Sequence, residues 1–392
     1  MSAQTMFHNA FVDHADHHSA LRESVARLMS GFGRKYFQDV LARKERPVEL
    51  WRALGEAGFL GVHIPEEWGG GGAGMGEYQI VLEEVLAHGC PMLQLVINSI
   101  CAPILNAFGS NAQKQEWLPS LANGTKRMSF GITEPDAGTN THKLSTTARK
   151  NGDGWVLQGA KYWTTAIDQA DAVLVVARDA DLSTPERGAL SLFIVPAHTR
   201  GLSWKKIDSA LMVPESSFFT FYDDVQLGPD ALVGEAGRGL RQVFSGLNPE
   251  RIAAAAFNNG ISRFALAQAA QYANDRKVWQ LPIGAHQGVS HPLAEAFANV
   301  QAARLVTARA ADLTDRGEDA AEACNMAKLL AADASLKALD QAIQIHGGNG
   351  LSYEYGLADL WFAARLHKTA PVSREMVLNH IAQHSLGMPK SY

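Results

Sequence analysis

Three polar stretches of the chain carry residue types that suit a flat cofactor with a phosphate tail. The first is the loop 130–140, Phe-Gly-Ile-Thr-Glu-Pro-Asp-Ala-Gly-Thr-Asn, whose amides and hydroxyls suit a planar polar ring. In 161–165, Trp163 could shield one face of a flavin while a threonine donates to a ring nitrogen. The third, 344–350, is rich in glycine, so its backbone can approach a pyrophosphate closely. Taken alone, each fits an ordinary role at least as well: a domain-entry loop, a core tryptophan and a glycine helix end.

One carboxylate has the sequence context of a general base. In the stretch 247–252, Leu-Asn-Pro-Glu-Arg-Ile, Pro249 fits the first position of a helix. Glu250 then shares a helical face with Leu247, Ala254 and Phe257. An apolar face removes water from a carboxylate, which raises its pKa and its strength as a base. The alternative is that Glu250 only offsets the helix dipole.

A glycine-rich turn has the spacing of a dinucleotide-binding motif but not its context. Gly69, Gly71 and Gly74 satisfy Gly-x-Gly-x-x-Gly, which works only after a strand and before a helix. Because Pro65 disrupts any preceding strand, we predict a plain turn.

A histidine-rich segment near the N-terminus has metal-ligand chemistry. His14, His17 and His18, with Asp13 and Asp16, could chelate a metal ion. They lie in a terminal segment with nothing evident to order them, so we expect no metal site. The sequence also has no His-Glu-x-x-His motif and no Gly-x-Ser-x-Gly elbow.

The elements that must position these residues change in character along the chain. Apolar residues recur at helical spacing over 20–122, whereas 128–235 is rich in β-branched and aromatic residues with turns between them. Asn-Gly-Asp-Gly at 151–154 predicts a hairpin. We expect strands over 155–165, 172–178, 190–195 and 218–225, and helices over 249–278, 291–315, 319–345 and 374–386.

The predicted fold class is α+β. We expect an N-terminal helical domain over 1–124, a middle β-domain of barrel or sandwich type over 125–236, and a C-terminal four-helix bundle over 237–392.

Composition excludes several partners. The 392 residues are 46% hydrophobic and 19% charged, which favours a large folded core. With 40 acidic and 35 basic residues the net charge is −5, which argues against nucleic acid or an anionic membrane as partner. The sequence has no apolar run long enough to span a membrane and no visible secretory signal. Three scattered cysteines argue against a disulfide scaffold and favour a cytoplasmic location.

Together the three polar stretches resemble the acyl-CoA dehydrogenase flavoprotein family. The opening resembles it too, in Leu21-Arg22-Glu23, in 50–58 and in Ile-Pro-Glu-Glu-Trp-Gly-Gly at 64–70, so the resemblance covers essentially the whole chain. It implies FAD as cofactor, an acyl-CoA thioester as substrate, a homotetramer built on the C-terminal bundles, and an electron-transfer flavoprotein as acceptor. The implied reaction removes the α-proton as H⁺ and passes a β-hydride to flavin N5.

The resemblance assigns roles to single residues of this chain. Ile132 and Thr133 match loop residues at the flavin ring, and Trp163 and Thr165 match the pair at the ring and its N5. Thr139 matches a serine that contacts substrate or flavin phosphate. The other implied cofactor contacts are Ser373 and the residues expected to hold the FAD of a neighbouring subunit, Arg276, Gln287, Gln344, Gly347 and Gly348. The chain departs from the common pattern at Asn140, where Asp is usual, and Val278, where Thr is frequent.

The usual catalytic base of the family is missing. Its Tyr-Glu-Gly-Thr stretch aligns with 367–373, His-Lys-Thr-Ala-Pro-Val-Ser, where Pro371 or, in a shifted register, Ala370 replaces the Glu. Isovaleryl- and long-chain-type members carry the Glu at the place of Glu250 instead. The resemblance therefore makes Glu250 the base, with Asn248 and Arg251 at the substrate, and leaves Glu375 as a weaker alternative.

Pro371 raises a second question, because the family uses the backbone N–H at that position and a ribityl hydroxyl of FAD to hold the thioester oxygen. Proline has no N–H. Either Ala370 donates in a shifted register or another group replaces it.

Two other functions remain open at this stage. The chain could be a family member with altered chemistry, such as an enoyl-CoA reductase or a lyase acting on a functionalised acyl-CoA. A flavin-bearing nucleic-acid-binding relative would need a basic extension after the bundle, which the sequence does not show. Fatty-acid or branched-chain acid catabolism is the expected setting, by analogy alone.

Overall fold

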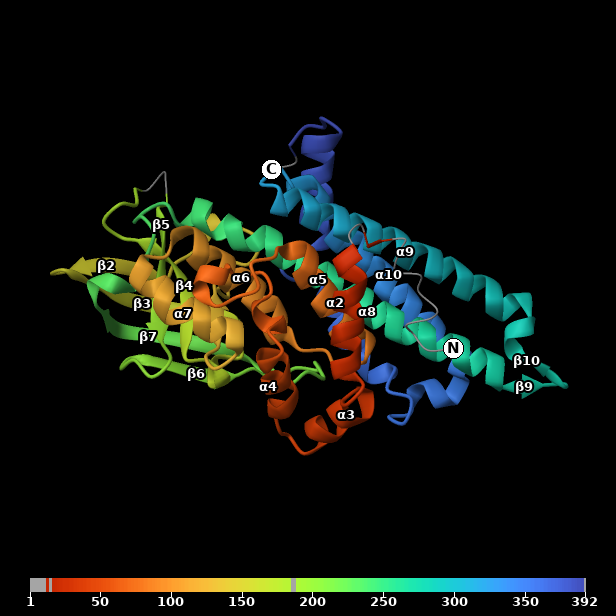
Figure 1. Ribbon diagram of the computed structural model, residues 1–392. Coiled ribbons are helices and arrows are strands. Elements are labelled where there is room, and N and C mark those ends of the chain that lie inside the picture. The colour runs from red at the N-terminus through yellow and green to blue at the C-terminus, as the bar shows by residue number, and fades with distance from the viewer. Residues whose placement is uncertain (1–11, 14–15, 185–187, 391–392) are drawn as a thin grey trace.

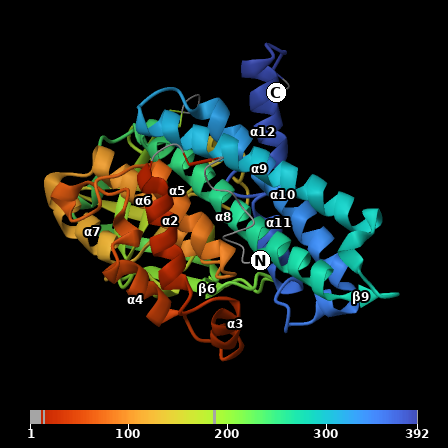
Figure 2. The ribbon, with the colours of Figure 1, turned by 45° about the vertical axis from the view of Figure 1, so that its right-hand side comes forward.

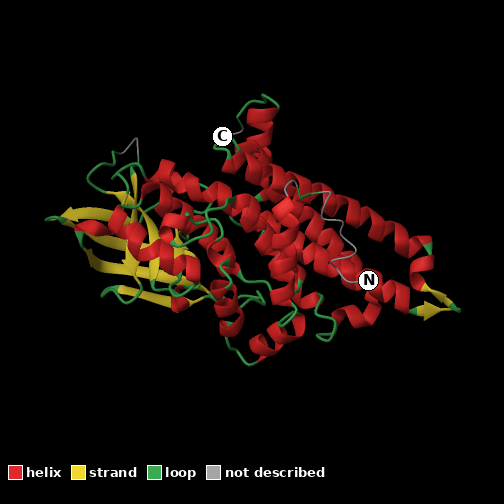
Figure 3. Cartoon of the chain, viewed as in Figure 1, coloured by secondary structure: helices red, strands yellow, loops and turns green. Residues whose placement is uncertain are grey.

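A computed structural model describes residues 12–13, 16–184 and 188–390. Helices of the N-terminal part lie between a β-domain at one end and a bundle of long helices at the other (Figure 1). Figure 3 shows the strands gathered at one end of the molecule, apart from a small hairpin at the opposite end. The α+β class and the order of its three parts, predicted from the sequence, are confirmed.

The N-terminal part is helical, as predicted. Its helices follow the apolar periodicity, and α7 begins with a capping box in which Ser110 Oγ accepts from the Gln113 amide and the Gln113 side chain accepts from the Ser110 amide. The helices are α2 (Asp16–Met29), α3 (Arg34–Ala42), α4 (Val48–Glu56), α5 (Met75–Ala87), α6 (Leu93–Phe108) and α7 (Asn111–Asn123).

The middle part is one eight-stranded sheet with the order β6-β7-β3-β2-β4-β5-β8 and with β1 parallel to β4. The predicted hairpin is present, since Asn151 pairs with Gly154 and Gly152 has a positive φ of 57°. The four predicted strands correspond to β3 (Gly154–Thr165), β4 (Ala172–Asp179), β5 (Leu190–Pro196) and β7 (Ser217–Leu227). The others, not predicted, are short: β1 (Met128–Gly131), β2 (Thr147–Asn151), β6 (Leu202–Lys206) and β8 (Leu232–Val233).

The C-terminal part is built around α8 (Gly239–Asp275), which packs on α5, α6, α9 and α10. The prediction that a helix starts at Pro249 is wrong, because α8 begins at Gly239 and carries Pro249 in its interior. Residues 239–248 stay helical because they pack on the sheet and on α6. A Cβ on Gly246 would lie 2.5 Å from the carbonyl oxygen of Ile100, so this close approach needs glycine.

The other end of α8 also differs from the prediction. The helix stops at Asp275, and Val278 lies in a two-residue strand, β9 (Lys277–Val278), paired with β10 (Leu281–Pro282). This hairpin is at the far tip of the bundle (Figures 1 and 2). The remaining helices are α9 (Gln287–Asp315), α10 (Ala321–His346), α11 (Trp361–Leu366) and α12 (Arg374–His380), with a π-helical turn over Ile381–Ser385.

A buried ionic cluster joins the N-terminal helices to the bundle. Arg22 on α2, Arg263 on α8 and Arg304 on α9 all converge on Glu83 of α5, with Nη1–Oε1 distances of 3.1 and 2.8 Å for Arg22 and Arg263 and an Nη2–Oε1 distance of 2.7 Å for Arg304. Arg22 and Arg263 also bind Glu84. Burial alone would raise the pKa of Glu83, but the three guanidiniums outweigh it and hold that pKa far below its usual range.

We predict that Glu83→Gln destabilises the protein by about 3–5 kcal/mol, because it removes the buried carboxylate charge on which three guanidiniums converge. Urea unfolding at pH 7 measures the loss. The exposed Arg316–Glu318 pair offers a matched control, since Glu318→Gln should change stability by less than about 0.5 kcal/mol. Equal effects of the two substitutions would contradict the role given to the cluster.

Candidate active site

The loop after β1 is fixed by a buried ion pair. Lys161 Nζ on β3 lies 2.7 Å from Glu134 Oε1 and donates to the carbonyl of Ile132 at 3.0 Å. The other Glu134 oxygen accepts from the amide and hydroxyl of Ser145, both at 2.6 Å. Burial would raise the pKa of Glu134, but Lys161 and these donors bring it down to about 2. The clamp was not predicted, although Lys161 and Glu134 both lie within the stretches singled out in the sequence.

Four of the residues proposed from the sequence lie where the end of β1 contacts the end of β3: Ile132, Thr133, Trp163 and Thr165. The Tyr162 amide donates to the Thr133 carbonyl at 2.7 Å, which brings the two segments into register. Trp163 has a left-handed backbone, with φ of 61°, and its side chain is 45% exposed. A bulky residue in this region is strained, and strain of this kind gathers at ligand sites. Trp163 is therefore not a core residue, and its exposed indole and the loop beside it fit the flat face of a flavin.

Glu250 lies on α8 among protein atoms but keeps part of its surface accessible. Desolvation raises the pKa of Glu250 to about 8, against the opposing effect of Arg251 and Lys328. The thiol of Cys101 on α6 feels the Glu250 charge and approaches the carbonyl of Ser129 on β1 at 3.8 Å. Leu247, three residues before Glu250 on α8, packs on the same hydrophobic cluster as Phe130 and Ile132, so this part of α8 lies near the loop after β1.

Asn248 and Arg251 form one unit beside Glu250. Arg251 Nη1 donates to Asn248 Oδ1 at 2.7 Å and to the carbonyl of Leu247 at 3.3 Å. Among the described residues, no partner lies within hydrogen-bond distance of the buried Arg251 Nε. A buried donor without a partner is costly, so Arg251 is suited to a polar ligand group.

The segment 370–373 shows which donors are taken. The Ala370 amide donates to the Leu366 carbonyl at 2.9 Å, so the shifted register in which it would hold a thioester oxygen is not available in this conformation. Ser373 caps α12, where its Oγ accepts from the Met376 amide at 3.3 Å.

Glu375 lies in the first turn of α12 and is exposed, unlike Glu250. Thr139 is exposed on its loop.

Lys328 on α10 was missed by the sequence reasoning. Its side chain is buried, its Nζ donates to the Val372 carbonyl, and it faces Glu250, Arg251 and His367. Burial, followed by Arg251, lowers the pKa of Lys328 to about 8. The signal was a single lysine on the apolar side of a helix, four residues after Cys324 and three before Ala331.

A second group of predicted residues lies at the far end of α8. Arg276 directly follows the last residue of α8. It lies about 26 residues beyond Glu250, which is roughly 40 Å along the helix axis. Tyr272 stacks on His346 with ring centroids 4.3 Å apart, so the end of α10 lies here too. Gln287, Gln344, Gly347 and Gly348 are exposed in this region, and no atom would lie within 4 Å of a Cβ on either glycine.

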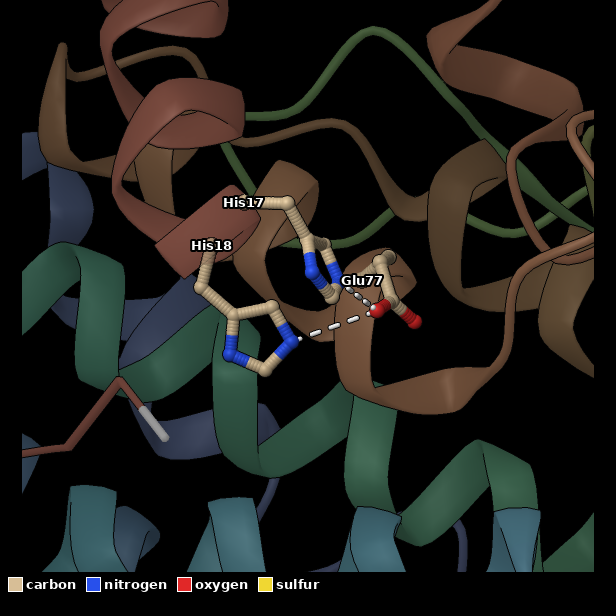
Figure 4. A group of neighbouring side chains, drawn as sticks. All are labelled: His17, His18 and Glu77. Atoms are coloured by element: carbon tan, nitrogen blue, oxygen red, sulfur yellow. Dashed lines mark hydrogen bonds and ion pairs between the residues drawn. The ribbon is translucent and has the colours of Figure 1, made fainter. Parts of the chain in front are cut away.

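The remaining motifs have a different setting. A 3-10 turn, Glu66–Trp68, precedes Gly69, so no strand leads into the glycine-rich turn. His17 and His18 lie on α2 and both contact Glu77 of α5 (Figure 4). The expectation that nothing orders this segment is wrong for these two histidines, because α2 packs on α5. His14 and the side chain of Asp16 lie outside the described residues.

Comparison with known proteins decides the family. Residues 15–125, 129–222 and 237–386 match the N-terminal, middle and C-terminal domains of acyl-CoA dehydrogenase. The acyl-CoA dehydrogenase FadE12 of Mycobacterium tuberculosis is 49% identical over 390 residues, which covers 99% of this chain and 100% of that protein. The chain belongs to the acyl-CoA dehydrogenase family. It is an FAD-dependent oxidoreductase.

Solved structures agree with this assignment. A glutaryl-coenzyme A dehydrogenase in complex with glutaryl-CoA superposes with a TM-score of 0.91 at 30% identity, covering 97% of each chain. An FAD-dependent dehydrogenase superposes with a TM-score of 0.87 at 26% identity, covering 96% of this chain and 99% of the other. Among the described residues of this acyl-CoA dehydrogenase, no helix is both long and apolar enough to cross a membrane.

We predict that Glu250→Gln stabilises the protein at alkaline pH. Because burial raises the folded-state pKa of Glu250 to about 8, above its unfolded value of about 4.5, folding takes up a proton between these values and stability falls as pH rises through that window. The variant escapes this penalty, by about 5 kcal/mol at pH 9 and by almost nothing at pH 4.5.

Thermal unfolding of both proteins from pH 5 to pH 9 measures the difference. The exposed Glu375, replaced by Gln, serves as the control and should show no pH-dependent gain. If the difference in melting temperature between Glu250→Gln and the parent stayed constant from pH 5 to pH 9, Glu250 would not be desolvated.

Proposed function

We propose that the protein oxidises an acyl-CoA thioester to its α,β-unsaturated product, with Glu250 as the base that removes the α-proton. The observation that carries the proposal is a desolvated, partly accessible carboxylate on α8 in a family member whose usual base position holds Pro371. Glu375 is exposed in the first turn of a different helix, α12, which makes it a poorer base.

FAD, when bound, supplies the two-electron acceptor for the β-hydride. The residues that fit its ring are Ile132, Thr133, Trp163 and Thr165, since they offer an exposed indole, backbone groups and hydroxyls on one edge. The Lys161–Glu134 clamp keeps this loop in place, so that binding the ring costs little ordering entropy. The indole of Trp163 excludes water from one face.

Glu250 holds the proton that leaves Cα. A thioester α-proton is weakly acidic, so its removal needs a strong base in a dry place. Desolvation raises the pKa of Glu250 and so makes its carboxylate a stronger base. The nearby Arg251 and Lys328 lower that pKa in part, so that the carboxylate can still ionise near neutral pH. Lys328 also holds the Val372 carbonyl, which fixes the segment 370–373 beside the base.

The negative charge on the thioester oxygen needs donors that this chain supplies differently from most relatives. Pro371 has no N–H, and the Ala370 amide is already bonded to Leu366. We propose that Arg251 Nε, which has no hydrogen-bond partner among the described residues, donates to this oxygen, with Asn248 orienting the guanidinium. FAD, when bound, would add a ribityl hydroxyl as a second donor, and Thr139 would contact a more distant part of substrate or cofactor.

We further propose a homotetramer whose subunits share their FAD sites. Arg276 lies roughly 40 Å along α8 from Glu250, so we assign it to the cofactor of a neighbouring subunit. The same role is proposed for the other residues at that end of the bundle: Gln287, Gln344, Gly347 and Gly348. Ser373 contacts the nearer cofactor. The proposal includes electron-transfer flavoprotein as acceptor, a cytoplasmic location, domains over 1–124, 125–236 and 237–392, and a fatty-acid or branched-chain acid substrate.

The direct test is anaerobic bleaching of the flavin absorbance by a panel of straight and branched acyl-CoAs. The parent should bleach with at least one of them, whereas Glu250→Gln should bleach at least about a hundredfold more slowly because the base is gone. Glu375→Gln should behave as the parent. Equal rates in the parent and Glu250→Gln would refute the assignment of the base. A parent that bleaches with none of the saturated acyl-CoAs would refute dehydrogenation itself.

The pH dependence of kcat/KM gives a separate test. Only the ionised base accepts a proton, so kcat/KM should rise with pH and level off above the pKa of Glu250, about 8 in the free enzyme. Arg251, Lys328 and the Cys101 thiol face this carboxylate. Lys328→Met removes one of the two cations, so it should move the rise to higher pH. The exposed Lys337 on the same helix, changed to Met, should leave the profile in place.

A further inference from the structure

Two histidines and a glutamate converge where the first turns of α2 and α5 meet. The Nε2 atoms of His17 and His18 lie 2.7 and 3.2 Å from the same oxygen of Glu77, and the three ligand atoms lie within 4.8 Å of one another (Figure 4). Glu77 is sixty residues beyond His17, so the group is assembled by the fold.

The way the three side chains are held leaves their ligand atoms directed inward. The second Glu77 oxygen accepts from the Gly74 amide at 3.0 Å, which fixes the carboxylate and turns the first oxygen toward the histidines. His18 and Glu77 are mostly buried, with 16% and 17% of their side chains exposed, while His17 is 65% exposed. The site is thus preorganised on two sides and open to water on the third.

The local charge favours a cation. Asp315 of α9 binds the amides of Met75 and Gly76 at 2.7 and 2.8 Å, so it offsets the positive end of α5 directly beside Glu77. With that helix end neutralised, the Glu77 charge remains available to an ion.

We propose that His17, His18 and Glu77 form a binding site for a divalent transition-metal ion of the Zn²⁺ type. Two imidazole nitrogens and one carboxylate oxygen are a ligand set that such ions prefer, and the open side provides room for water as a fourth ligand. Adjacent ligands of a tetrahedral Zn²⁺ lie roughly 3.3 Å apart, close to the distances here, so small side-chain movements suffice. The ion would tie α2 to α5, beside the buried ionic cluster and outside the catalytic site.

The experiment uses the full-length, FAD-loaded enzyme after treatment with a chelator and dialysis. Titration with ZnCl₂ in a calorimeter at pH 7.5 should show one site per chain, and Co²⁺ in its place should give visible absorption bands of a tetrahedral N/O site. Binding should raise the melting temperature and weaken on acidification, because protonated imidazoles cannot bind a metal.

Three variants separate this site from incidental binding. Glu77→Gln and His18→Gln keep hydrogen-bonding side chains at the helix contact, and each should weaken Zn²⁺ binding at least about tenfold without changing flavin content or activity. His384→Asn disrupts the other histidine pair, His380 and His384, and should leave binding unchanged. The proposal is overturned if Zn²⁺ does not saturate one site per chain, if binding is undiminished in Glu77→Gln or His18→Gln, or if it is lost in His384→Asn.

Discussion

The convergence of three arginines on Glu83 and Glu84 sets the position of the helix on which the site depends. Arg263 belongs to α8, and its guanidinium is fixed against α5, together with those of Arg22 and Arg304. Glu250 lies thirteen residues earlier on α8, roughly 20 Å along the axis and on another side of the helix. A rotation of α8 that moved Glu250 would therefore also pull Arg263 from its carboxylates, which makes such a rotation costly.

Glu250 shows the opposite use of burial. The cations around Glu83 outweigh the cost of removing its carboxylate from water, so Glu83 stays ionised. Arg251 and Lys328 offset only part of the same desolvation cost at Glu250. The result is a carboxylate whose pKa is raised to about 8. Native-state stability is given up for basicity, a trade that is frequent at catalytic carboxylates and agrees with the proposed role of Glu250.

Local sequence patterns predicted the parts of the fold that short-range physics determines. Turn chemistry predicts the hairpin at Asn151–Gly154, and the periodicity of apolar residues predicts the long strands and the helical N-terminal and C-terminal parts. The predicted start of α8 was wrong because a proline in sequence is expected at the first position of a helix. Only the packing of residues 239–248 on the sheet and on α6 shows that the helix runs through Pro249. The short strands β1, β2, β6 and β8 are defined by their partners rather than by their own composition.

The same limit applies to the site. Glu250 and the flavin-facing loop could be proposed from residue types and family resemblance, but their surroundings come from distant segments. Lys328 meets Val372, and His17 meets Glu77, through contacts between helices that no local pattern encodes. The histidines in particular were dismissed because the sequence offered nothing to order them, whereas α2 gains its order from packing on α5.

The length of α8 places a further constraint on function. The helix carries the proposed base about a third of the way along its length, and Arg276 directly follows its last residue, roughly 40 Å away, which is more than one FAD can span. If both ends contact FAD, they contact two different cofactors, and a single subunit then holds half of each site. Trp279 and Leu281 in the hairpin beyond Arg276 are exposed, with 87% and 54% of their surface accessible, which fits the subunit contact of the proposed tetramer. In the proposed tetramer, flavin affinity would depend on assembly, since dissociation of the subunits would separate the loop proposed to bind the ring from the residues proposed to hold the rest of the cofactor.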